Sequence, residues 1–157
     1  MNIKYLIKLK ENPERFTGSE LNSPIQSLHL DEIYELELTY NNGIPFPTAL
    51  KELLFLAGDD CYVLDYGLTT DRKEMQDDAR LWLSEFNRNI TRPLFVIDIY
   101  NAGDQFLFVY LDEHPQDPTV YSAYLPEQTY EALPWIHSLN NKLSEFINYR
   151  IGKPRVD

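Results

Sequence analysis

The stretch that decides the fold is "LFVIDIYNAGDQFLFVYLDEHPQDPTVYSAYL", residues 94–125. It contains three segments of β-branched and aromatic residues, at positions 94–100, 105–112 and 119–125, as is typical of strands. The segments are separated by "NAGD" and "EHPQDP", which are rich in residues that form turns. Because short connections of this kind join antiparallel neighbours, we expect the three segments to form an antiparallel meander.

The chain on either side of the meander carries helical patterns. The run "FPTALKELLFLAG" (residues 46–58) has prolines at its start, leucines at helical spacing and Gly58 at its end. The run "TTDRKEMQDDARLWLSEFNRN" (residues 69–89) predicts an amphipathic helix with an acidic start. Its expected inward residues are Met75, Ala79, Trp82, Leu83 and Phe86. Between these two helices, "CYVLDYGLT" (residues 61–69) is predicted to be a strand that leads to a turn.

The last long segment, "LPWIHSLNNKLSEFINYRI" (residues 133–151), is predicted to be one helix that packs on the sheet. Six apolar residues fall at helical spacing within it: Ile136, Leu139, Leu143, Phe146, Ile147 and Ile151.

Two further segments match both a helix and a strand. Residues 2–10, "NIKYLIKLK", are too few for periodicity to decide, and we favour a helix over an edge strand. In "LDEIYELELTYNNG" (residues 30–43), alternate positions suit a strand, whereas Leu30, Ile33, Leu36 and Tyr40 share one helical face. The ends of this segment favour a helix, because acidic residues suit its start and Gly43 can take the positive φ that follows a last helical turn.

These elements predict a single α+β domain over residues 1–157, because helices and strands occur in separate runs instead of alternating. Two helices lie in the N-terminal half, and an additional helix and a C-terminal helix pack against a mostly antiparallel sheet. Residues 1–29 are expected to form an N-terminal element and a connecting loop.

The net charge of −11 is concentrated in one part of the chain. Residues 17–78 hold thirteen acidic residues against three basic ones. A surface of that sign repels nucleic acid and anionic lipid, so we expect neither as a partner and favour a basic protein. Solubility alone also explains such a charge. Cys61 is the single cysteine, and "MNIKYLIKLK" interleaves apolar residues with lysines unlike a signal peptide, so we expect a cytoplasmic protein.

The sequence lacks the local patterns that accompany common catalytic sites, such as the nucleophile elbow, the phosphate-binding loop and the zinc-protease motif. His29, His114 and His137 lie far apart in the chain. In "DEHPQD" (residues 112–117), oxygens and an imidazole are able to bind a metal, but Pro115, Pro118 and the position between two strands favour a polar hairpin loop. We therefore expect no cofactor and no metal site, and an enzyme would need a catalytic site assembled from distant residues.

Paired carboxylates next to tyrosines form the candidate partner-binding surface. Unneutralised carboxylates speed the encounter with a cationic partner and then pair with its Arg or Lys side chains. Eleven tyrosines exceed the need of a core, although packing remains a role for them. The candidate residues are Asp59, Asp60, Asp65, Tyr66, Asp77, Asp78, Tyr100 and Asp104. The alternative interpretation is that these residues lie on solvated loops and helix faces.

Four short motifs occur in a recognisable order. The first is Ile33, Leu36 and Glu37, followed by "GIPFP" (residues 43–47) and then by Leu50, Lys51, Leu53 and Leu54. The second is "NAGDQFLFVYLD" (residues 101–112), the third "PTVY" (residues 118–121) and the fourth "KLSEFI" (residues 142–147). This order resembles the SUKH superfamily of bacterial toxin-immunity proteins, which includes a yeast regulator of cell-wall synthesis. The resemblance covers residues 30–151.

The resemblance implies an α+β domain that binds protein and catalyses nothing. It implies an immunity protein that neutralises a cognate toxin of a bacterial polymorphic toxin system, with a nuclease or a deaminase as the toxin. The alternative it implies is an intracellular adaptor or regulator of cell-wall glucan synthesis or of signalling. Where many members have an Asn-Gly-Gly turn, this chain has Gly58, Asp59 and Asp60, which we interpret as a partner-facing variation.

Overall fold

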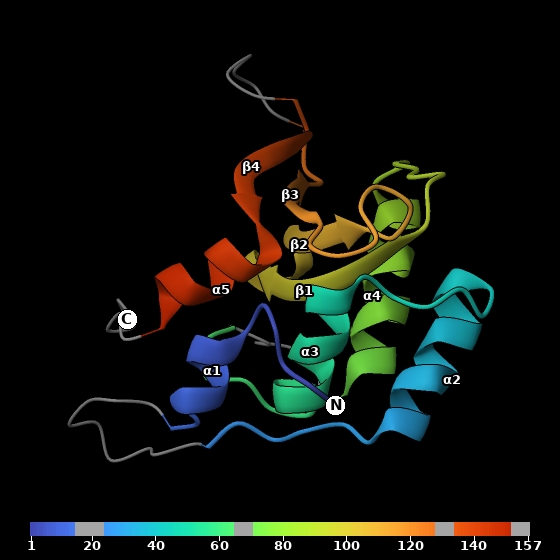
Figure 1. Cartoon of the computed structure of the whole chain (residues 1–157). Helices are drawn as coiled ribbons and strands as arrows, with labels where there is room; N and C mark the ends of the chain where they lie inside the picture. Colours follow the sequence, from blue (N-terminus) through green and yellow to red (C-terminus); the bar gives the residue numbers. More distant parts are fainter. Residues whose placement is uncertain (15–23, 65–70, 128–133, 152–157) are drawn as a thin grey trace.

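The computed structural model describes residues 1–14, 24–64, 71–127 and 134–151 (Figure 1). The arrangement is α+β, as predicted. In chain order the elements are α1 (Ile7–Glu11), α2 (Leu30–Asn41), α3 (Thr48–Ala57), α4 (Arg72–Glu85), β1 (Leu94–Tyr100), the 3-10 turn η1 (Asn101–Gly103), β2 (Gln105–Tyr110), β3 (Thr119–Tyr124), β4 (Ile136–Lys142) and α5 (Leu143–Arg150). Within the described ranges, no helix combines the length and hydrophobicity that crossing a bilayer requires.

The described strands form an antiparallel sheet in the order β1-β2-β3-β4. The predicted meander is therefore confirmed, and β4 extends it by one strand. Leu94 pairs with Tyr110 where β1 meets β2, and a bulge interrupts this register between Val96 and Asp98. The bulge changes which face of the sheet the following residues occupy, because side chains alternate strictly along a regular strand.

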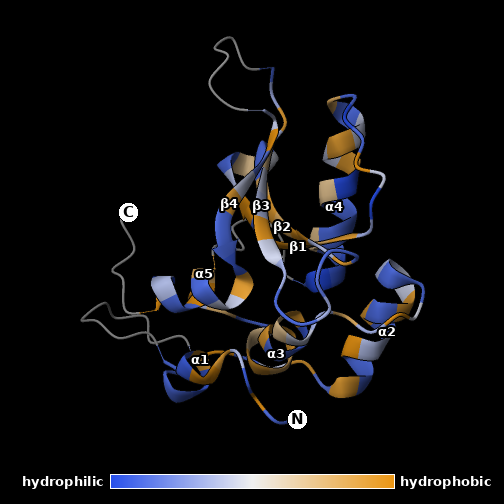
Figure 2. Ribbon diagram, turned by 45° about the horizontal axis from the view of Figure 1, so that its top comes forward, coloured by the Kyte–Doolittle hydropathy of each residue, from blue (hydrophilic) through white to orange (hydrophobic). Residues whose placement is uncertain are grey.

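Helices cover both faces of the sheet, so the molecule has two hydrophobic clusters. The larger cluster joins α1, α2, α3 and α5 to one face, where Phe95 and Val109 are fully buried. The smaller one joins α4 to the opposite face through Met75, Ala79 and Leu83. Figure 2 shows the strands between α4 and α5, whereas α2 lies beside α4. The expected inward residue Phe86 is instead 38% exposed, because α4 ends at Glu85.

Two predictions of secondary structure are wrong. Residues 61–64 form turns after α3 and not a strand; their apolar side chains enter the core without a neighbouring strand to pair with, and residues 65–69 lie outside the described part. Residues 136–142, predicted as the first half of a helix, form strand β4, so His137 lies on a strand. Pairing with β3 supplies backbone hydrogen bonds that a sequence pattern does not reveal.

The helical predictions for residues 30–41 and 48–57 are confirmed, and that for residues 2–10 is confirmed in part. The helix near the N-terminus begins only at Ile7, because the preceding backbone binds a side chain instead. The N–H groups of Lys4, Tyr5 and Leu6 donate to the Glu52 carboxylate at 2.7, 2.8 and 2.9 Å, and Glu52 is fully buried in α3. A buried carboxylate thus holds the N-terminal segment against the core.

The edge of strand β1 is covered by side chains of α4. Gln76 is fully buried; its amide accepts from the Val96 N–H at 2.7 Å and donates to the Val96 C=O at 2.8 Å. Arg80 donates to the Leu94 C=O at 3.1 Å. These bonds satisfy strand groups that would otherwise offer a template for pairing with another chain.

Candidate protein-binding surface

The acidic turn after α3 is held by the segment that precedes α2. The N–H of Asp59 donates to the Gln26 C=O at 2.9 Å, and the N–H of Gln26 donates to the Asp60 C=O at 2.8 Å. The side chain of Asp59 is exposed, whereas that of Asp60 is half-buried. The structure therefore brings these two predicted site residues together at one end of α3.

The first residue of α4, Arg72, is buried next to this turn. Its Nε donates to the Gly58 C=O at 2.5 Å and its guanidinium also reaches the Ala57 C=O at 3.3 Å. Burial lowers the pKa of Arg72 to about 10, and nearby negative groups, Asp59 and Asp60 among them, act in the opposite direction. The two carboxylates thus lie near a buried positive charge, and the interpretation of this turn as a partner-facing variation stays a prediction.

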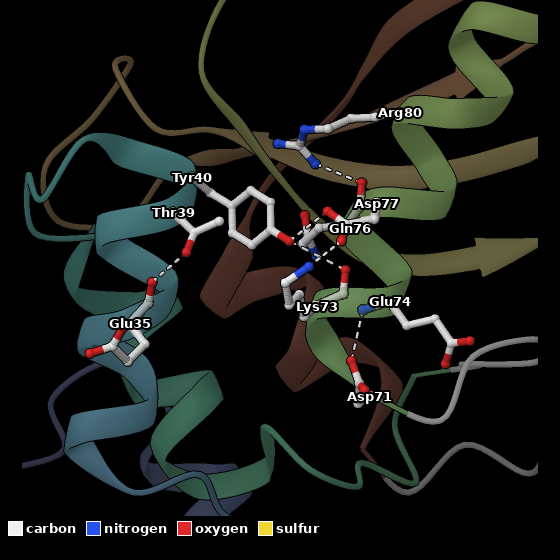
Figure 3. Close-up of polar contacts among 9 residues, drawn as sticks. All are labelled: Glu35, Thr39, Tyr40, Asp71, Lys73, Glu74, Gln76, Asp77 and Arg80. Atoms are coloured by element: carbon white, nitrogen blue, oxygen red, sulfur yellow. Dashed lines mark hydrogen bonds and ion pairs between the residues drawn. The ribbon is translucent and has the colours of Figure 1, made fainter.

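The second carboxylate pair does not share one surface. Asp77 accepts from Lys73 at 2.5 Å and from the Tyr40 hydroxyl at 2.8 Å, contacts that join α4 to α2 (Figure 3). The hydrogen bond from Lys73 lowers the pKa of Asp77. Consecutive helical residues point about 100° apart, so Asp78, which is half-buried, lies on another side of α4.

Tyr100 belongs to a buried ionic cluster and not to an open surface. Its hydroxyl donates to Asp98 at 2.5 Å, and Arg150 donates to the same carboxylate oxygen at 2.9 Å. Asp98 is fully buried, and burial raises the pKa of Tyr100. Asp104 lies half-buried in the turn between β1 and β2. The predicted site residues Asp65 and Tyr66 lie outside the described residues.

The histidines are dispersed as the sequence suggested. The backbone N–H of His29 donates to Glu32 at the start of α2, and His114 accepts backbone N–H groups from its own turn at 3.3 and 3.2 Å. In residues 1–14, 24–64, 71–127 and 134–151, no three His, Cys, Asp or Glu side chains lie where they could hold a metal ion together. Cys61 is buried, and burial raises the pKa of its thiol to about 11, as expected of an unreactive packing residue.

The most prominent exposed apolar surface lies on α2. Leu30, Tyr34 and Leu38 are 53%, 53% and 43% exposed, and their spacing of four residues places them in one stripe along the helix. Ile44, just beyond the helix, is 61% exposed. The side chain of Leu38 lies over Gly43, so the stripe continues towards Ile44. We call these four residues the α2 stripe.

Exposed carboxylates lie beside the α2 stripe. Helical geometry places Asp31 and Glu35 next to it and Glu32 further around the helix, towards α4. Figure 3 shows Glu35 and the acidic residues of α4 on either side of the seam that Tyr40 fills. The outer side of α2 therefore combines apolar and acidic side chains, and the acidic residues Asp71 and Glu74 of α4 continue it across the seam.

Sequence reasoning missed this surface because it assigned Leu30 to the buried face of α2. The buried face holds Ile33, Leu36 and Glu37. A signal was present, since residues 30–44 contain more large apolar residues than one buried helical face needs. Tyr34 and Leu38 are the apolar residues that the buried face of α2 does not need.

The motif residues that resemble the SUKH superfamily are part of the scaffold. Glu37 is buried; its carboxylate accepts from the Phe46 N–H at 2.8 Å and pairs with Lys51 at 3.1 Å. Gly43 has a φ of 76°, which fits the glycine of "GIPFP". These contacts fix the joint between α2 and α3, and so they orient the α2 stripe without belonging to it.

Comparison with family models, with curated proteins and with solved structures finds no match for this chain.

Proposed function

We propose that this protein is a non-enzymatic binding protein that occupies a basic surface of a partner protein through the outer side of α2. The partner, on the resemblance to the SUKH superfamily, is a bacterial toxin domain, a nuclease or a deaminase, which the protein neutralises. The observation that carries the proposal is the α2 stripe beside a row of exposed carboxylates. The central site residues become Tyr34 and Leu38 in place of the carboxylates after α3.

The composition of this surface supports a protein partner. Exposed leucine, isoleucine and tyrosine side chains in one stripe are costly in water and are typical of interface centres, where aromatic anchors contribute most of the binding energy. A rim of carboxylates adds electrostatic attraction to a basic surface and raises the association rate. A nuclease surface that holds phosphate is basic, so the charge of the α2 surface is complementary to it.

The test uses the toxin domain encoded by the reading frame beside this one, purified with and without this protein. We expect a stable complex and complete inhibition at a one-to-one molar ratio. Inhibition at a small fraction of that ratio would mean that the protein destroys or modifies the toxin and would make it an enzyme. If the neighbouring reading frame encodes no toxin domain, the proposal that the partner is a toxin is contradicted.

The variant Tyr34→Ala/Leu38→Ala locates the interface. Truncating two central apolar side chains is expected to weaken binding at least about tenfold, since such residues contribute about 1.4 kcal/mol or more. The matched control is Ile7→Ala/Tyr149→Ala, which truncates exposed apolar side chains on α1 and α5. Equal weakening by both variants, measured by calorimetry, would place the interface elsewhere.

A further inference from the structure

A cleft of about 780 Å³ lies between the end of α2, the C-terminal half of α4 and the segment that leads into β1. Its volume falls in the range of about 300 to 1,000 Å³ that is usual for small-molecule sites. Buried Leu83, Leu94 and Leu111 form its apolar part, and the side chains of Asn41 and Asn42 are among its polar lining. The cleft adjoins the α2 stripe at Ile44, but Tyr34 and Leu38, the central residues of the proposed protein-binding surface, do not line it.

The charge of the cleft is opposite to that of the whole chain. Acidic residues outnumber basic ones by 25 to 14 overall, yet three arginines and one acidic residue line the cleft. Arg92 is paired with that acidic residue, Asp112, at 2.7 Å. Among the described residues, neither Arg80 nor Arg88 forms an ion pair at contact distance. The charge of Asp77 acts on Arg80, whereas Arg88 is paired with no carboxylate in the described structure.

Both of these arginines are held in place by their surroundings. The guanidinium of Arg80 lies 4.7 Å from the ring centre of Tyr40 and donates to the Gln76 C=O at 2.8 Å. The guanidinium of Arg88 lies 5.2 Å from the ring centre of Trp135. The Nε of Arg88 is buried and, within the described structure, has no hydrogen-bond partner. A buried donor without an acceptor costs free energy.

We propose that this cleft binds a small organic phosphate monoester, with Arg80 and Arg88 at the phosphate group. A phosphate monoester carries a charge of about −1.5 to −2 at neutral pH, which matches two guanidinium groups better than a single carboxylate does. Guanidinium groups present planar sets of donors that suit phosphate oxygens. The acidic surface elsewhere on the chain repels polyanions, so a small ligand fits and a nucleic acid does not.

The test is a titration of the isotope-labelled protein, followed by amide chemical shifts, with AMP, glycerol 3-phosphate, inorganic phosphate and adenosine in turn. We expect at least one monoester to shift amides of residues 41–44 and 88–92, and adenosine not to shift them. Failure of both monoesters to bind overturns the proposal. Equal binding by adenosine and AMP also overturns it, and inorganic phosphate that binds as tightly as the monoesters shows a site for the free anion only.

Arg88→Gln is expected to weaken monoester binding about tenfold, because a charge-assisted hydrogen bond is lost. The control Lys10→Gln removes the same charge from exposed α1 and is expected to leave the affinity unchanged. If the control weakens binding as much as Arg88→Gln does, the effect reports net charge and the site assignment is wrong. Circular dichroism of both variants verifies the fold, and the wild-type shift map stands independently if Arg88→Gln does not fold.

Discussion

At the scale of single residues, three acidic residues of the described structure act inside the molecule. Glu37, Glu52 and Asp98 are buried, and each is bound by backbone N–H groups or by a cation. Such carboxylates raise the formal negative charge without presenting it to a partner. Charge counted along the sequence therefore overstates the acidic surface, and only exposed carboxylates such as Asp31 and Glu35 are available for docking.

The buried carboxylate of Glu52 gives the first prediction at this scale. Glu52→Ala leaves three backbone N–H groups of residues 4–6 without their acceptor, so we expect a loss of at least about 3 kcal/mol in the free energy of unfolding. Urea denaturation measures this loss. Glu35→Ala, an exposed glutamate on α2, is the matched control and should change stability by about 0.5 kcal/mol or less. Similar losses for both variants would contradict the anchoring role.

At the scale of elements, α4 acts as a cover for the edge of the sheet as well as a helix of the core. Its residues Met75 and Ala79 pack on the sheet face, while Gln76 satisfies the backbone of β1 beside the bulge. The Cβ that an alanine would add at Gly103 would lie 2.7 Å from the ring of Trp82, so α4 also packs tightly on the β1–β2 turn. The stability of α4 and the stability of the edge strand β1 therefore depend on each other.

Gln76→Leu tests this dependence. The variant keeps the apolar bulk but leaves the Val96 N–H and C=O unpaired, and we expect a loss of about 2 to 3 kcal/mol in stability. Hydrogen exchange at the Val96 amide should accelerate more than exchange at Phe108, which lies on the interior strand β2. Equal acceleration at the two amides would mean that only global stability changed.

At the scale of the whole molecule, self-repulsion outweighs the exposed ion pairs. The net charge is −11, whereas Lys73–Asp77 and Arg92–Asp112 are exposed ion pairs that water and salt screen. Salt screens both the repulsion among like charges and the attraction within the ion pairs. We expect the loss of repulsion to have the larger effect on stability. The thermal midpoint should therefore rise between about 0.01 M and about 1 M NaCl, over which the Debye length falls from about 30 Å to about 3 Å. A midpoint that falls over this range would contradict the prediction.

The amino-acid sequence by itself determined the fold class and most elements of this protein, because strand, turn and helix signals are local. The meander at residues 94–125 and the helices at residues 30–41 and 48–57 follow from periodicity, turn residues and helix ends. The sequence also contained surplus apolar residues in α2, although it did not show which of them reach solvent.

Tertiary structure alone decided the rest, because burial and pairing depend on residues distant in the chain. Ile136 lies at helical spacing from the apolar residues that follow it, but its segment pairs with β3 and forms a strand. Asp59 lies in an acidic turn, and its charge acts on buried Arg72, which belongs to the start of α4. The arginine cleft likewise arises only where separate elements meet. The exposure of the α2 stripe also depends on tertiary packing, since no local pattern records which side of a helix the rest of the chain covers.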